Sequence, residues 1–210
     1  MKKLIITILA IMLFSGTLIA EGLSKKGVKI GLNLSTIRIS DNENADDIND
    51  MYKTKFGGSI GGFVTIDINE QLSVQPEIYY TMKGTDIELE IMNHTFKGSM
   101  TLNYIEVPIL VVFKLQPGIG LYGGPSLSYF LNGTTTNEDE DGKEKTEDID
   151  KDEISVYDLG LVVGGSYTLP EGISIDLRYT LGLLNVNDES KNDKSTINNH
   201  LFQLMVGYSF

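Results

Sequence analysis

Hydrophobic and polar residues alternate one by one through most of this chain, and the pattern is clearest near its end. Between residues 200 and 210, one row of alternate positions is apolar or aromatic and comprises Phe202, Leu204, Val206, Tyr208 and Phe210. The other row holds Gln203, Gly207 and Ser209, although Leu201 and Met205 also fall on it. Since successive side chains of a β-strand point to opposite faces, a period of two predicts a strand with two chemically different faces.

The same alternation predicts seven further strands upstream. They occupy residues 28–36, 56–68, 72–82, 104–115, 119–131, 157–169 and 173–183. Weak alternation continues beyond residue 82, so the third and fourth strands are expected to rise past a membrane and to turn near Asn93 and His94.

The connections between the eight predicted strands are of two kinds, in strict rotation. Long polar segments at 40–54, 132–153 and 185–199 alternate with turns of two or three residues that contain Gly, Pro or Asn. Transmembrane β-barrels place short turns on one rim and long loops on the other. The sequence therefore predicts an all-β fold, an eight-stranded antiparallel up-and-down transmembrane β-barrel with both termini in the periplasm.

The alternation by itself does not decide which medium the apolar rows face. In a membrane barrel they face lipid, and aromatic residues near the strand ends act as interfacial anchors. The candidate anchors are Tyr80, Tyr129, Tyr157, Tyr208 and Phe210. In a soluble eight-stranded carrier the same rows would line a ligand pocket, but such a fold does not need two kinds of connection in rotation. The loops favour the membrane interpretation.

If the apolar rows face lipid, the other rows face a lumen that side chains fill, because eight strands leave no room for an open pore. The charged residues expected in this lumen are Lys29, Glu77, Glu106, Asp158, Asp176 and Arg178. Isolated buried ions are costly, so these groups should pair. The mixed signs favour a structural charge network over a proton or ion path.

Two irregularities interrupt the pattern. Beyond Thr36 the apolar residues Ile37 and Ile39 change rows, which a bulge or the end of the membrane-spanning part would explain. Pro76, Pro108 and Pro125 lie within predicted strands, although proline cannot donate to a sheet ladder. Each of these prolines is predicted to mark a bulge or a strand end.

The first 22 residues have the organisation of a secretory signal peptide. Lys2 and Lys3 precede an apolar run at 4–20, and the small residues Ala20 and Gly22 are spaced as a cleavage site requires. A retained membrane anchor is the alternative, but the run is at the short end for a spanning helix. We therefore expect cleavage of residues 1–22 and a barrel domain at 23–210.

Composition and charge narrow the chemistry. The chain has no cysteine, which excludes disulfides, thiolate metal sites and a lipid-modified amino-terminal cysteine. Its formal net charge of −12 at pH 7 disfavours nucleic acid as a partner. An acidic exported protein remains.

Candidate metal and catalytic residues are few. Asn137, Asp139, Asp141, Gly142 and Asp148 approach the spacing of a calcium loop. A solvated acidic loop is the better interpretation, since Asn stands first, Asp replaces the final Glu and Lys145 takes an apolar position. His200 lies near Ser195 and Asp193 in sequence, and His94 lies in a loop, which gives little support for an outer-membrane lipid hydrolase. We expect neither catalysis nor a cofactor.

Several short runs resemble one family of membrane barrels. The run Tyr-Ile-Glu-Val-Pro-Ile-Leu at 104–110 resembles the signature strand of the PorT-like outer membrane protein beta-barrel domain family. Residues 27–35, 118–128 and the pairs Arg178-Tyr179 and Gly182-Leu183 are similar to its first, fifth and seventh strands. The resemblance covers nearly all of the expected mature chain, except the acidic segment 132–153. It implies an eight-stranded barrel of the small OmpA and OmpX architecture in a Gram-negative outer membrane, and it implies no reaction.

These observations lead to one expected function and two alternatives. We expect a monomeric integral outer-membrane barrel with a filled lumen and long acidic extracellular loops, in a structural or surface-interaction role. Its expected partners are outer-membrane lipid and the barrel-assembly machinery, because the terminal aromatic Phe210 resembles a barrel-insertion signal. The alternatives are a soluble exported barrel that binds a small apolar ligand and an outer-membrane lipid-modifying enzyme.

Overall fold

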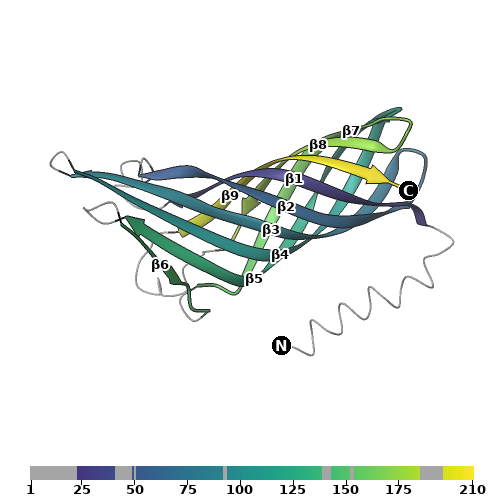
Figure 1. Cartoon of the computed structure of the whole chain (residues 1–210). Coiled ribbons are helices and arrows are strands. Elements are labelled where there is room, and N and C mark those ends of the chain that lie inside the picture. Colours follow the sequence, from purple (N-terminus) through teal and green to yellow (C-terminus); the bar gives the residue numbers. More distant parts are fainter. Residues whose placement is uncertain are drawn as a thin grey trace.

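The computed structural model describes residues 23–40, 49, 51–91, 94–138, 143–151, 154–184 and 196–210. The expected signal peptide at 1–22 lies outside these residues. These residues form nine strands: β1 Leu23–Ser40, β2 Tyr52–Asp67, β3 Leu72–Ile91, β4 His94–Gln116, β5 Ile119–Glu138, β6 Glu144–Asp148, β7 Tyr157–Thr168, β8 Ile173–Gly182 and β9 Thr196–Ser209 (Figure 1). Within the described residues, no helix is long and apolar enough to cross a membrane.

Eight of the strands close into a barrel. They follow one another in the order β4, β3, β2, β1, β9, β8, β7, β5, and the pairing of β4 with β5 completes the ring. Every pairing is antiparallel. The short turns and the C terminus lie at one end, and the tip of β3 and β4 lies at the other (Figure 1). The predicted eight-stranded antiparallel barrel is therefore confirmed.

Glycine makes two of the short turns possible. Gly118, between β4 and β5, has a φ of 80°, and Gly172, between β7 and β8, has a φ of 88°. Side chains with a Cβ rarely adopt this left-handed backbone, whereas glycine does so at little cost. The tight turns at this rim thus follow directly from the sequence.

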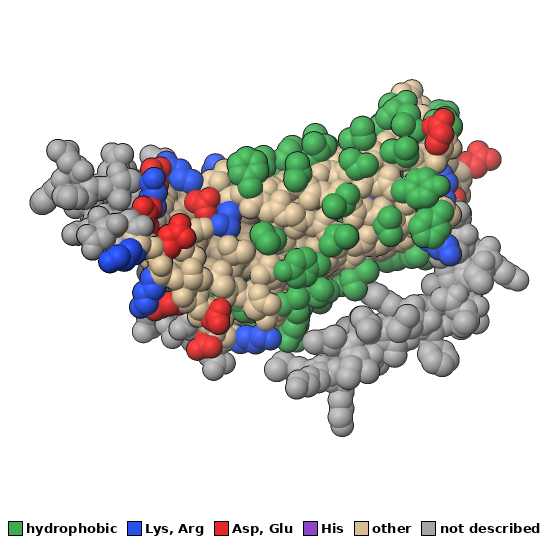
Figure 2. Space-filling model, in the orientation of Figure 1, with side chains coloured by type: hydrophobic (Ala, Val, Ile, Leu, Met, Phe, Trp, Pro, Cys, Tyr) green, Lys and Arg blue, Asp and Glu red, His purple; other side chains and the backbone are tan. Residues whose placement is uncertain are grey.

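The apolar rows face outward. On β9, Leu204 is 46% exposed and Val206 is 50% exposed, whereas the intervening Met205 is fully buried. The polar Gln203 is 2% exposed, so the polar row points into the barrel. Figure 2 shows hydrophobic side chains along the wall, with charged side chains gathered towards the ends. The soluble-carrier alternative is therefore wrong, because it requires the apolar rows to line the interior.

The aromatic residues proposed as anchors fall into two groups. Tyr80, Tyr129 and Tyr157 belong to one row of cross-strand partners, in which Ile105 pairs with both Tyr80 and Tyr129. The rings of Tyr129 and Tyr157 lie 5.5 Å apart. Tyr208 pairs with Ile173, the first residue of β8 after the short turn, and its ring centroid lies 6.3 Å from that of Phe210.

The acidic segment at 132–153 contains regular structure, which the sequence did not predict. β5 runs on to Glu138 after a register shift against β4 at Asn103 and Tyr104. β6 then pairs with it from Thr134 opposite Asp148 to Glu138 opposite Glu144. Ladder hydrogen bonds do not require apolar side chains, and a threonine run at 134–136 favours the extended backbone. Similarly, β9 begins at Thr196, within the last segment expected to be a loop.

The prolines lie inside unbroken strands, so the expectation of a bulge or strand end is wrong. Each keeps a partner on one side while the pairing is interrupted on the other: Pro76 pairs with Ile109, Pro108 with Ser126 and Pro125 with Leu161. None of the described register shifts falls at a proline. Because proline lacks only its own N–H, the ladder loses bonds on one side and the register survives.

The row change at Ile37 also needs no bulge. The pairing of β1 with β9 is continuous from Gly27 to Ser40. Ile37 is 5% exposed and simply occupies the inward row. An apolar residue on that row indicates that the interior becomes apolar towards the long-loop end.

Candidate functional site

The inward rows bring charged side chains together in the lumen. The buried charged residues of the described chain are Lys29, Glu77, Lys83, Glu106, Asp158, Asp176 and Arg178. Six of these were expected from the sequence, and Lys83 was missed. Lys83 lies on β3 in the same row as Glu77, so extending the alternation by one residue beyond Met82 would have found it.

Four of these residues form a network that we call the neutral cluster: Lys29, Glu77, Asp176 and Arg178. Lys29 Nζ lies 3.0 Å from Glu77 Oε1 and 2.7 Å from Asp176 Oδ1. Arg178 Nη1 donates to Glu77 Oε2 at 2.7 Å, and Nη2 donates to Glu77 Oε1 at 3.3 Å. Two cations face two carboxylates, and the bidentate guanidinium fixes their geometry. The cluster joins β1, β3 and β8 across the lumen.

Aromatic rings enclose the neutral cluster. The Arg178 guanidinium carbon lies 5.5 Å from the Tyr79 ring centroid and 5.3 Å from that of Tyr122. Lys29 Nζ lies 4.8 Å from the Phe63 centroid. Ring faces attract cations, and these rings also exclude water from the ion pairs. The barrel interior at this level is packed with side chains.

The remaining three charges form a second group, which we call the acid-rich cluster: Lys83, Glu106 and Asp158. Lys83 Nζ lies 3.5 Å from Glu106 Oε2 and 4.0 Å from Asp158 Oδ2. Ser126 Oγ donates to Glu106 Oε1 at 3.0 Å, and Asn199 Nδ2 donates to Asp158 Oδ2 at 3.1 Å. Here one cation faces two carboxylates.

An apolar plug fills the lumen at the long-loop end. It comprises Leu102, Tyr104, Phe130 and Ile154, with Met100 and Ile149 packed against them. The chain that returns from β6 is held there by the Ile149 N–H bonded to Gly133 O at 2.9 Å and the Phe130 N–H bonded to Val156 O at 2.8 Å. The segment 132–153, expected to be a solvated acidic loop, therefore contributes the partly buried Ile149 to this plug.

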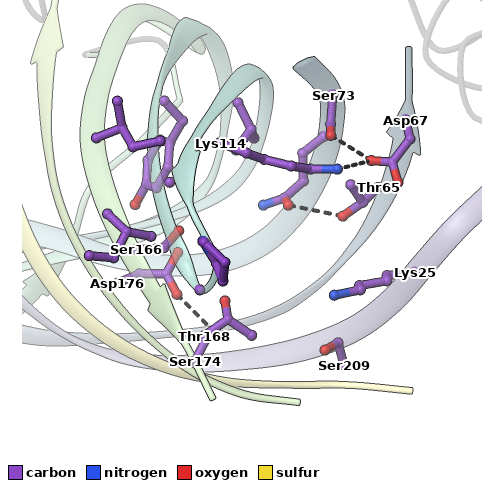
Figure 3. Close-up of a pocket in the computed structure, with 18 of the residues that line it drawn as sticks. Lys25, Thr65, Asp67, Ser73, Lys114, Ser166, Thr168, Ser174, Asp176 and Ser209 are labelled. Carbon is purple, nitrogen blue, oxygen red and sulfur yellow. Dashed lines mark hydrogen bonds and ion pairs between the residues drawn. The ribbon is translucent and has the colours of Figure 1, made fainter. Parts of the chain in front are cut away.

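A cavity of about 490 Å³ occupies the opposite, short-turn end of the lumen. Ser73, Ser166, Thr168, Ser174 and Ser209 contribute hydroxyl groups to its wall (Figure 3). Lys114 Nζ lies 2.7 Å from Asp67 Oδ1, and Ser174 Oγ donates to Asp176 Oδ2 at 3.0 Å. Asp176 and Lys29 both line this cavity and belong to the neutral cluster, so the cluster closes it towards the barrel centre.

The ends of the candidate calcium loop do not converge. Asn137 lies opposite Lys145 and Asp148 lies opposite Thr134, so the two are offset by three residues along the ladder. Because this offset is an odd number of residues, the two side chains point to opposite faces of the hairpin and do not converge on one ion. Asp139 and Asp141 lie outside the described residues. Lys145 and Glu147 pair at 2.6 Å on exposed β6, and the hydrogen bond from Lys145 holds the pKa of Glu147 below its ordinary value.

The two histidines are placed differently from one another. His200 lies within β9, and its Nδ1 shares a hydrogen bond with the Tyr179 hydroxyl. Ser195 and Asp193, the other members of the weak hydrolase candidate, lie outside the described residues. His94 begins β4, opposite Ile91. Within the described residues, the hydrogen-bond partner of His200 is therefore the hydroxyl of Tyr179 on the neighbouring strand β8.

A closed barrel with an apolar outer wall and a charged, filled interior defines the class of transmembrane β-barrels. Residues 23–188 match the family model described as outer membrane protein beta-barrel domain, and the chain belongs to this family. The protein is accordingly an outer-membrane barrel.

Solved structures of other outer-membrane proteins resemble this one. Neisserial surface protein A (NspA) is 15% identical, with 88% of this chain and 97% of that chain covered, at a TM-score of 0.51. Ail, the attachment invasion locus protein of Yersinia pestis, is 15% identical, with 89% of this chain and 98% of that chain covered, at a TM-score of 0.48. The likeness to NspA shows a shared fold. No curated protein matches the sequence.

Proposed function

We propose that this outer-membrane protein is a closed-lumen barrel that presents its long-loop end at the cell surface for structural or adhesive contacts, without catalysis. The main support is the blocked interior. The apolar plug around Leu102 and Ile154 fills one end, and the neutral cluster around Arg178 fills the middle. Such an interior offers stability rather than a passage for solutes.

The shape of the wall favours a surface role for the long-loop end. β3, β4 and β5 have 20, 23 and 20 residues, whereas β7 and β8 have 12 and 10. A tilted membrane strand needs about 9–11 residues. The longer strands, together with β6, therefore extend as a sheet beyond the ends of β7 and β8 (Figure 1). Charged side chains gather at this end, where the hydrophobic side chains of the wall stop (Figure 2). This sheet is the surface that an extracellular partner would meet.

The finer parts of the proposal concern export and assembly. We place residues 1–22 as a cleaved signal peptide, both termini and the short turns in the periplasm, and the chain within the PorT-like branch of its family. The Phe210 N–H donates to Lys26 O at 2.8 Å, so the last residue is held against β1 where the ring closes. Its side chain is 64% exposed, which leaves the terminal aromatic accessible to the assembly machinery.

Cysteine labelling tests the proposed orientation, because the natural chain has no cysteine. Thr146→Cys places a thiol on exposed β6, and Glu171→Cys places one on the exposed turn between β7 and β8. A membrane-impermeant maleimide should label Thr146→Cys on intact cells and Glu171→Cys only after the outer membrane is permeabilised. Labelling of Glu171→Cys on intact cells, with Thr146→Cys protected, would refute the orientation.

A further inference from the structure

The lumen charges do not balance. Over the described residues, three buried cations face four buried carboxylates. The neutral cluster is balanced by itself, so the surplus falls on the acid-rich cluster, where Lys83 alone faces Glu106 and Asp158. An uncompensated ion in a dry interior is strongly destabilising.

Two carboxylate oxygens of the acid-rich cluster also lack a hydrogen-bond partner, although one of them, Glu106 Oε2, is paired with Lys83. Glu106 is 2% exposed and Asp158 is 6% exposed. Among the described residues, neither Glu106 Oε2 nor Asp158 Oδ1 has a hydrogen-bond partner. Buried carboxylate oxygens are normally hydrogen-bonded. Among the described residues, these are the buried carboxylate oxygens without a hydrogen-bond partner, and both belong to the residues that carry the surplus charge.

Within the described part of the chain, the other groups that contact the cluster do not supply a second cation. β5 contributes the hydroxyls of Ser126 and Ser128, to which Glu106 and Lys83 bond. β9 contributes the amide of Asn199. β4 contributes Tyr104, whose ring centroid lies 5.2 Å from Lys83 Nζ. These neutral groups solvate the charges locally, but they leave the charge count unchanged.

We propose that the acid-rich cluster is a proton-binding site that holds one proton at neutral pH on the Glu106 and Asp158 carboxyl pair. Two carboxylates that share a confined site do not both ionise, because their repulsion and desolvation favour the neutral form of one. The proton comes from water and converts one carboxylate to a carboxylic acid. The remaining carboxylate then pairs with Lys83, and the lumen becomes neutral.

Infrared spectroscopy of the full barrel in lipid nanodiscs at pH 7 tests the site. The wild type should show the C=O band of a protonated carboxyl, with a shift in heavy water. Glu106→Gln and Asp158→Asn should each abolish the band, because one lysine then faces one carboxylate. Glu147→Gln, on exposed β6, is the control and should keep the band. Absence of the band in the wild type, or its survival in either lumen variant, would overturn the proposal.

Unfolding in urea at the same pH gives an independent readout. An amide is a close substitute for a neutral carboxyl, so both lumen variants should fold and retain the wild-type urea midpoint. A large loss of stability in either would mean that both carboxylates are ionised, which contradicts the proposal. A wild-type midpoint that changes when sodium replaces choline at fixed pH and fixed ionic strength would show that a metal cation, and not a proton, compensates the charge.

Discussion

Replacing Arg178 by methionine should lower the free energy of unfolding by about 3–5 kcal/mol. Arg178 is 2% exposed and makes two hydrogen bonds to Glu77. Without it, Lys29 alone would face Glu77 and Asp176, and one of these buried carboxylates would lack a cation. The measurement is reversible urea unfolding of the barrel in lipid vesicles, followed by gel mobility and circular dichroism.

A double variant separates charge from packing at this position. Glu77→Met together with Arg178→Met removes a whole ion pair and leaves Lys29 with Asp176, 2.7 Å apart. Replacing both members of a buried pair by apolar groups is often neutral or stabilising. The double variant should therefore recover most of the stability lost by Arg178→Met. Equal losses in the single and double variants would show that shape, rather than charge balance, decides stability here.

Placing arginine at Leu204 should cost about 2–4 kcal/mol, the range for a charge on the lipid face near the bilayer midplane. Leu204 lies near the middle of the paired part of β9, between Leu32 on β1 and Leu177 on β8. All three side chains are exposed on the outer wall. Urea unfolding in lipid vesicles again measures the effect.

The matched control for Leu204→Arg is Thr146→Arg on β6, whose residues are all exposed on the hairpin beyond the barrel. A surface substitution of this kind usually changes stability by less than about 0.5 kcal/mol. If Leu204→Arg were equally harmless, the outer row would face water and not hydrocarbon.

The barrel could be predicted because its two faces differ residue by residue. On β8, Ile173, Ile175 and Leu177 are exposed while Asp176 and Arg178 are buried. These are the two rows that the sequence pattern predicts. A shift of one residue would move every charge to the lipid side, so the pattern specifies both the strand and its register. For this reason the inward charges could be named before their contacts were known.

The apolar plug could not be predicted in the same way, and Lys83 was missed where the alternation weakens. Ile154 follows an acidic run in which apolar residues do not alternate with polar ones. It is buried because the chain returns over the end of the barrel, and no local periodicity of the sequence predicts that return. Lys83 precedes Gly84, Thr85 and Asp86, where the apolar row fades, so the predicted third strand ended too early. At the prolines, the rule for single strands failed because neighbouring strands on the other side preserve the register.

The central claim is that hydrocarbon surrounds the outward apolar rows of this barrel. A spin label on Val206→Cys, in a chain with no other cysteine, tests it by collision with oxygen, which partitions into lipid, and with a polar nickel chelate, which stays in water. The account predicts a label in lipid nanodiscs that is accessible to oxygen and shielded from nickel. Strong nickel collisions with weak oxygen collisions at this position would contradict it.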